Sequence, residues 1–254
     1  MNKIWMLLVT ISLMYSFISC SNSRKAEVEN QNAVNTYLAY KTQTSPEIDG
    51  LLNDECWESK SWDTLDQVWL GAAFSPDDFQ GRYCLAWDDS LLYLFLEIID
   101  DSLTNFYSNP LIQYWDDDCV EVFIDEDHSG GIHQYNHQAF AYHISSTMDA
   151  IDIGSDKQAH YYNHHIKGAI KKNKTKYSWE LAIRIFGKEY SDSTNDNRPK
   201  TLTSNKTMGF SLAYCDNDSS EFRENFIGSV NSPGHFKNDG WINASCFGKL
   251  ILVE

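Results

Sequence analysis

Positive charge is scarce in this sequence. Lysine and arginine together number 20 against 36 aspartate and glutamate residues, which gives a formal net charge of −16. A surface of this sign repels phosphate backbones, so the composition argues against a nucleic-acid partner. It is compatible with neutral ligands and with divalent cations.

Long apolar runs are absent beyond the N-terminus. The apolar segment 4–18 follows one positive residue, Lys3, in the layout of a secretory signal. It is shorter than the roughly 20 residues that span a bilayer. The tetrad Phe17-Ile18-Ser19-Cys20 resembles a bacterial lipobox, which implies cleavage before Cys20 and a lipid on its sulfur. We therefore expect a lipoprotein signal over residues 1–19 and an exported protein that is lipid-anchored to the bacterial outer membrane or cell surface. The periplasmic face is the other location for the anchor. An ordinary signal peptide is the alternative to a lipoprotein signal.

The next segment, 20–36, is rich in Ser, Asn, Lys and Glu and has little to bury. It is predicted to be a flexible tether. The remaining residues, 37–254, suit one domain, because all-β domains often run to roughly 200–250 residues. No internal repeat is visible.

Cysteine motifs are also absent. None of the cysteines lies in a C-x-x-C motif or close to a histidine, which argues against a zinc site. Five cysteines follow Cys20, and an odd number cannot all pair. Buried thiols acting as small hydrophobes are the favoured interpretation, although an exported protein also permits one disulfide.

Helical patterns are almost absent, and only residues 53–60 look helical. Strand-like runs recur with polar, Gly- and Asn-rich breaks between them, which favours an all-β antiparallel β-sandwich of the jelly-roll or immunoglobulin-like kind. Within 119–125 the side chains alternate, so Glu121 is predicted to point away from the face that carries Val120 and Val122. The predicted strands are 82–88, 91–98, 119–125, 134–145, 160–170, 177–185, 207–214, 222–230 and 247–253.

Five segments, in this order, resemble the family 9 carbohydrate-binding modules that accompany xylanases and also occur as bacterial lipoproteins. They are Ile48-Asp49-Gly50-Leu51-Leu52-Asn53-Asp54-Glu55-Cys56-Trp57, the run 85–94 (LAWDDSLLYL), the run 115–125 (WDDDCVEVFID), Met208-Gly209-Phe210-Ser211 and the run 241–250 (WINASCFGKL). Together they span the predicted domain. The resemblance implies a β-sandwich that binds the end of a sugar chain between two tryptophans.

Matched motif by motif, the resemblance implies that these tryptophans are Trp115 and Trp241. The polar partners that it implies are Glu121, Asn238 and Arg223. Where some xylanase-linked members have an arginine, this chain reads Phe140-Ala141-Tyr142-His143, so their reducing-end disaccharide specificity is not carried over.

These residue types suit a sugar. A pyranose has an apolar face and a rim of hydroxyls, so its site needs flat aromatic surfaces and a few fixed donors and acceptors. We predict that Trp115 and Trp241 face each other across a surface slot with Glu121, Asn238 and Arg223 on its rim. The alternatives are that Glu121 is a solvated strand residue and that Arg223 only pairs with a neighbouring glutamate. Three other tryptophans, Trp57, Trp87 and Trp179, are predicted to be core residues.

A metal site is predicted from aspartates rather than histidines. The eight histidines match no compact ligand pattern, whereas Asp100-Asp101, Asp116-Asp117-Asp118 and Asp125-Glu126-Asp127 lie at predicted strand ends and offer the hard oxygens that calcium prefers. The family resemblance implies a structural calcium with Asp100 as a ligand. The alternative is a solvated acidic edge.

The leading interpretation is a non-catalytic module that binds an oligosaccharide or polysaccharide at the cell envelope and supports carbohydrate catabolism beside glycosidases or a transporter. Two alternatives stay open from the residues. One is a glycoside hydrolase that uses a carboxylate pair containing Glu121. The other is a haem-binding sandwich in which Met148 or Met208 acts with a histidine, although no C-x-x-C-H motif is present.

Overall fold

The structure is a computed structural model that describes residues 35–58, 61–232, 234 and 237–254. These residues belong to one unit, 35–254. The predicted signal, Cys20 and nearly all of the predicted tether lie outside the described residues. Strand β1 (Thr36–Lys41) begins at the last residue of the predicted tether. Among the described residues, no helix has both the length and the hydrophobicity to cross a membrane.

Strands dominate the described chain, as predicted. After β1 they are β2 (Asp63–Leu65), β3 (Gln67–Leu70), β4 (Phe79–Trp87), β5 (Leu92–Asp100), β6 (Cys119–Asp125), β7 (Phe140–Ser145), β8 (Ala150–Ile153), β9 (Ala159–Tyr161), β10 (Ile166–Asn173), β11 (Lys176–Ile183), β12 (Thr207–Asp216), β13 (Asn225–Gly228) and β14 (Gly248–Val253). Two 3-10 turns accompany them, η1 (Glu55–Trp57) and η3 (Ala244–Cys246).

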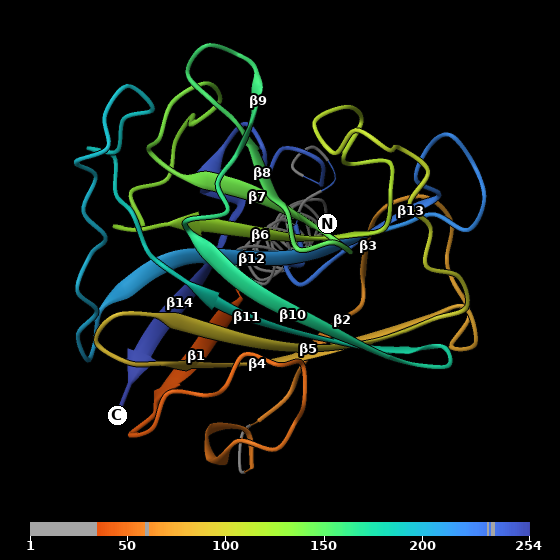
Figure 1. The fold of residues 1–254 in the computed structure, drawn as a ribbon, viewed down its shortest axis with the longest axis horizontal. Helices are drawn as coiled ribbons and strands as arrows, with labels where there is room; N and C mark the ends of the chain where they lie inside the picture. The colour runs from red at the N-terminus through yellow and green to blue at the C-terminus, as the bar shows by residue number, and fades with distance from the viewer. Residues whose placement is uncertain (1–34, 59–60, 233, 235–236) are drawn as a thin grey trace, which may run out of the picture. The chain divides into compact units, whose positions relative to one another are not determined.

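The strands follow one continuous ladder in the order β10-β11-β5-β4-β1-β14-β12-β6-β7-β8-β9. Off this path, β13 pairs with β12 and with β3, and β2 pairs with β4. Figure 1 shows β12, β6, β7 and β8 together in one part of the unit and β11, β5 and β4 in another, with β1 and β14 between them. The pairing is antiparallel except at β1, which runs parallel to both of its neighbours, β4 and β14. The first strand of the domain therefore joins the two halves of the ladder.

The core lies between the two halves. One buried cluster contains Leu85 and Leu94 from β4 and β5 together with Val120 and Val122 from β6 and Leu212 from β12. Side chains that alternate inward along each strand interdigitate in this way in a β-sandwich. The fold class predicted from the strand pattern is confirmed.

The predicted core tryptophans are buried. Trp87 and Trp179 belong to the main core, and Trp57 belongs to a smaller cluster on the outer side of β4, β5 and β11. Leu212 and Val122 are both fully buried, so the strands next to the site, β12 and β6, are fully packed on their core side. The sheet face that carries the site therefore rests on a rigid support.

The first family-like segment has a structural role. The buried carboxylate of Glu180 on β11 accepts hydrogen bonds from Asp49 N at 3.0 Å, Gly50 N at 2.9 Å and Trp57 Nε1 at 3.0 Å. Gly50 has a φ of +81°, and a Cβ there would lie only 3.0 Å from Lys171 Cγ. This anchored segment forms a single 3-10 turn, so the helix expected over 53–60 is wrong for the described residues Asn53–Glu58.

Candidate functional site

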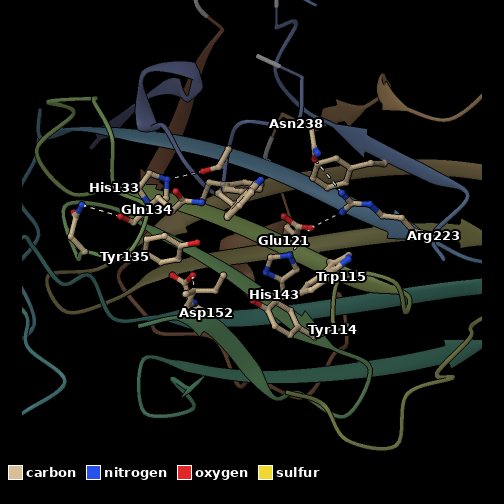
Figure 2. A pocket seen from close by; sticks show the side chains of 16 residues that line it. Tyr114, Trp115, Glu121, His133, Gln134, Tyr135, His143, Asp152, Arg223 and Asn238 are labelled. Atoms are coloured by element: carbon tan, nitrogen blue, oxygen red, sulfur yellow. Dashed lines mark hydrogen bonds and ion pairs between the residues drawn. The ribbon is translucent and has the colours of Figure 1, made fainter. Parts of the chain in front are cut away.

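A cavity of about 370 Å³ lies on the face of β6, β7 and β8 that carries Glu121 and His143. Its size falls within the roughly 300–1,000 Å³ of typical small-molecule sites. Side chains from β6, β7 and β8 form its floor (Figure 2). Loops that carry Trp115, Gln134, Arg223 and Trp241 surround it. The lining residues are Tyr114, Trp115, Glu121, Phe123, His133, Gln134, Tyr135, Asn136, His143, Asp152, Ile153, Arg223, Phe226, Asn238, Gly240 and Trp241. All five of the predicted ligand-binding residues are in this set.

The two predicted tryptophans supply partly exposed aromatic surface to the cavity. Trp115 is 39% exposed and Trp241 is 37% exposed, whereas Trp87 and Trp179 are fully buried. Trp115 packs edge-on against Tyr114, with ring centroids 5.0 Å apart. Neither indole is a core residue, so both remain available to a ligand.

The loop that carries Trp241 is held against the floor by a glycine and a histidine. A Cβ on Gly240 would lie 2.8 Å from Phe123 Cε1, so only glycine lets the backbone approach β6 this closely. His133 contacts Gly240 O through Nε2 at 2.8 Å, and its backbone N donates to Ile242 O at 2.9 Å. These contacts orient the loop before any ligand is bound.

The floor carries a buried network of charges around Glu121, which is only 2% exposed. Its Oε1 lies 2.8 Å from His143 Nε2, 3.3 Å from Arg223 Nη1 and 3.0 Å from Cys215 Sγ. Burial opposes ionisation, but the charge and hydrogen bond of His143, together with the charge of Arg223, hold the pKa of Glu121 below its ordinary value. Glu121 is therefore an ionised acceptor in an apolar setting.

His143 has an acceptor beside each ring nitrogen. Its Nδ1 lies 3.2 Å from the carbonyl oxygen of Ala141, and its Nε2 lies 2.8 Å from Oε1 of Glu121. The ring is therefore held in place between the strand backbone and the Glu121 carboxylate. Among the described residues, every hydrogen bond to the Glu121 carboxylate goes to Oε1, so Oε2 is left for a ligand hydroxyl.

Arg223 connects the floor to the rim. Its Nη1 contacts Glu121, its Nη2 donates to Asn238 Oδ1 at 3.1 Å, and its guanidinium lies 4.2 Å over the ring of Phe226. Asn238 is exposed, and the bond to its oxygen directs its amide nitrogen away from Arg223 (Figure 2). The pair presents fixed donors beside the acceptor of Glu121.

A protein-family model described as "Carbohydrate family 9 binding domain-like" matches residues 48–254 of this chain. The chain belongs to this family. The resemblance found in the sequence motifs is thereby confirmed.

Two curated relatives of this family 9 domain are xylanases. Endo-1,4-beta-xylanase A of Thermotoga maritima is 26% identical over 246 residues, and that of Thermotoga neapolitana is 25% identical over the same length. The match covers 94% of this chain but 20% of each xylanase, so the chain spans about a fifth of the length of these relatives.

Solved structures have the same fold. A family 9 module from Caldicellulosiruptor kristjanssonii in complex with cellotriose has a TM-score of 0.64 and 22% identity, over 86% of this chain and 94% of that one. The module from the same organism in complex with glucose has a TM-score of 0.61 and 22% identity, over 85% and 95% of the two chains. A putative carbohydrate-binding protein from Bacteroides uniformis has a TM-score of 0.58 and 12% identity, over 87% and 100%.

The structure corrects one feature of the predicted site. Glu121 and the guanidinium of Arg223 lie at the floor of the cavity rather than on its rim, because the loops that carry Trp115 and Trp241 rise around β6. The alternatives of a solvated Glu121 and of an Arg223 that pairs only with a neighbouring glutamate are therefore wrong. Asn238 is exposed at the edge, as predicted.

Sequence reasoning missed His143 and the loop 133–136. His143 ends the segment Phe140-Ala141-Tyr142-His143, which had been noted only for lacking an arginine. Its place beside Glu121 follows from the β6–β7 register, which sets Glu121 opposite His143. The loop residues Gln134 and Tyr135 have no periodic signal, and only the fold brings them to the cavity.

The two alternative functions find no support in this family 9 domain. The second carboxylate at the cavity, Asp152, accepts Ala141 N at 2.8 Å and Ile153 N at 2.7 Å, so each of its oxygens already has a backbone donor. Of the two methionines considered as haem ligands, Met208 is fully buried in the core. Met148 packs against that core, and neither lines the described cavity.

An acidic cluster lies apart from the sugar-type cavity. Carboxylate oxygens of Asp100, Asp118 and Asp216 lie within 4.8 Å of one another, and all three residues are buried. Burial and mutual repulsion raise the pKa of Asp118 to about 9 and that of Asp216 to about 7, and burial raises the pKa of Asp100. A set of hard oxygens in need of positive charge fits calcium.

The cluster contains one residue from each of two predicted acidic segments, 100–101 and 116–118, and none from the third, 125–127. Asp117 is engaged by Phe106 N at 2.7 Å, and Asp125 is engaged by Gly130 N at 2.7 Å. Asp216, which lies in none of the predicted acidic segments, completes the cluster because β12 pairs with β6. A second group of acids with oxygens equally close comprises Asp78, Asp101 and Asp218.

Proposed function

We propose that this chain is a non-catalytic carbohydrate-binding module that holds a neutral oligosaccharide in the cavity lined by Trp115 and Trp241. One observation carries the proposal. Two partly exposed indoles line the same cavity as the ionised Glu121, whose Oε2 is free for a hydroxyl, and the donors of Arg223 and Asn238. Aromatic faces and fixed polar groups are the two features that a pyranose requires.

Cellotriose and glucose are the first probes to use, because related family 9 modules have been solved with them. Titration of the purified protein by calorimetry tests the proposal. Trp115→Ala and Trp241→Ala should each weaken binding by about 30-fold or more, since a central aromatic residue is worth roughly 2 kcal/mol or more in a small site. Their melting temperatures should stay near that of the wild type.

Trp179→Ala is the matched control. This indole is fully buried in the core, so its loss should cost about 3–5 kcal/mol of stability and leave sugar binding intact below the melting transition. Unchanged affinity in both cavity variants, or release of shorter sugars during incubation of the wild type with cellotriose, would contradict the proposal.

We also propose that Cys20 carries a lipid that holds the module at the bacterial cell envelope. The support is the lipobox-like tetrad and the apolar segment before it. Held there, the module would keep polysaccharide close to glycosidases or a transporter of the same system. The xylanase relatives support a connection to polysaccharide breakdown.

We propose calcium as a structural ion at Asp100, Asp118 and Asp216. The support is the oxygen-only donor set and the raised pKa values of these three buried acids. Calcium would neutralise their mutual repulsion and tie the end of β5 to β6 and β12.

A further inference from the structure

A second cavity of about 320 Å³ lies beside the first, on the same face of the sheet. Its floor contains Cys119 of β6 and Ser145 of β7, which are opposite each other in the β6–β7 pairing. Glu121 and His143 of the first cavity form the next opposite pair on the same face, two residues further along each strand. Same-face residues of a strand are roughly 7 Å apart. The two cavities are therefore successive positions along one face.

Tyr114 and His143 line both cavities and form the wall between them. The two rings pack edge-on with centroids 4.7 Å apart. No described residue is recorded as a hydrogen-bond partner of the Tyr114 hydroxyl, although Tyr114 is only 7% exposed and burial raises the pKa of that hydroxyl. With no partner among the described residues, this hydroxyl is available to a ligand at the wall.

Tyr107 gives the second cavity a rigid aromatic surface. Its hydroxyl donates to Glu221 O at 2.7 Å, and its backbone N donates to the Asp117 carboxylate at 3.1 Å. The ring is held at both ends and needs little further ordering when a ligand stacks on it. Tyr107 could then act as Trp115 and Trp241 act in the first cavity.

The polar lining of the second cavity is rich in acceptors. Ser145 Oγ and Thr147 Oγ1 lie 2.8 Å apart, and Thr147 donates to Asp149 Oδ2 at 3.1 Å. Asp117 and Asp149 also line the cavity, and the one basic side chain among its described lining residues is His143, whose Nε2 faces Glu121. Such a lining accepts from hydroxyl groups, and its two carboxylates disfavour an anionic ligand, which favours a neutral sugar over a uronic acid.

We infer that the second cavity is a further subsite for a neutral glycosyl residue, so that an oligosaccharide bound in the first cavity continues past Tyr114 onto Tyr107. The inference rests on the proposed function of the first cavity. Because the two cavities are only one same-face row apart, it predicts that the affinity of the chain rises with ligand length from one sugar ring to three.

The test compares glucose with cellotriose as ligands of the full chain. The wild type should bind cellotriose roughly five- to tenfold more tightly, a gain of the size expected for one added stacking contact. Tyr107→Ala should abolish that gain and leave the affinity for glucose within about twofold. Tyr107→Phe keeps the ring and should keep the gain.

Amide and indole NMR signals locate the contact directly, which keeps the test valid if Tyr107→Ala disturbs its loop. Glucose should shift the indole signals of Trp115 and Trp241, and cellotriose should also shift the amides of Tyr107 and Thr147. Equal affinities for the two sugars in the wild type, or no shift at Tyr107 and Thr147, would overturn the second subsite alone. Absence of any binding to the wild type would instead overturn the proposed function.

Discussion

Replacement of Glu121 by glutamine tests the charge network beneath the sugar site. The carboxylate is 2% exposed and its Oε1 has His143 Nε2 at 2.8 Å and Arg223 Nη1 at 3.3 Å. Glu121→Gln removes the negative charge and leaves the largely buried guanidinium of Arg223 without its carboxylate partner. The loss of one partner from a buried ion pair costs about 3–5 kcal/mol.

This loss should be visible in a melting curve. A destabilisation of 1 kcal/mol lowers the melting temperature of a domain of this size by about 2–4 °C, so Glu121→Gln should lower it by roughly 6–20 °C at neutral pH. The same variant should bind cellotriose much more weakly, because the carboxylate acceptor of the cavity becomes an amide.

The pH dependence gives the prediction a sign. The pKa of Glu121 in the folded protein lies below its ordinary value of 4.5, so its ionisation stabilises the fold above about pH 4.5 and this contribution is lost as the pH falls below that value. The stability difference between wild type and Glu121→Gln should therefore be full between pH 5 and 7 and shrink toward acid.

Glu180→Gln is the matched control. Glu180 is also fully buried, but it accepts from Asp49 N, Gly50 N and Trp57 Nε1 rather than from cationic side chains. Its replacement leaves no buried cation and lies away from the cavity, so sugar binding should be unchanged. The reasoning is refuted if Glu121→Gln melts within about 1 °C of the wild type at pH 6, since a buried ion pair cannot then be present.

Three further predictions concern the metal, the histidine core and the anchor. A chelator should lower the melting temperature of the wild type. Calcium should bind more tightly as the pH rises from 6 to 9, because Asp118 and Asp216, with pKa values of about 9 and 7, must lose protons to bind it. An Asp118→Asn variant should respond to neither chelator nor calcium, and a wild type with the same melting curve in chelator would exclude the site. Burial lowers the pKa of His165 from 6.5 to about 2, so the folded state binds fewer protons than the unfolded state and stability should fall as the pH drops below 6.5. In melting curves recorded over a series of pH values, His165→Phe should reduce this loss of stability toward acid. An equal loss in both proteins would contradict a buried, neutral His165. Cys20→Ala should move the protein out of the membrane fraction of the producing cells, and a wild type that is already soluble would argue against the lipid anchor.

Much of the fold could be predicted from the sequence, because alternation along a strand is a local property. The runs around Leu85, Leu94 and Val120 identify buried strands directly, and Trp87 and Trp179 were predicted as core residues for the same reason. The parallel pairing of β1 was not predicted, because one of its two partners, β14, lies more than 200 residues away in the chain.

The five predicted ligand-binding residues were placed by motif resemblance and not by periodicity. Alternation assigns Glu121 to the face opposite Val120 and Val122, but it does not say whether that face meets solvent or a loop. The loops around Trp115 and Trp241 cover it, which buries Glu121 and makes its charge depend on His143.

Local sequence patterns were sufficient to predict the fold class, the buried strands and the residue types needed for a sugar. The contacts between the polar side chains of the site and of the acidic cluster depend on the tertiary structure. His143 reaches Glu121 through the β6–β7 register, and Asp216 reaches Asp118 and Asp100 through the pairing of β12 with β6. Such contacts join residues that are far apart in the chain, and their energies depend on burial and distance, which no local pattern encodes.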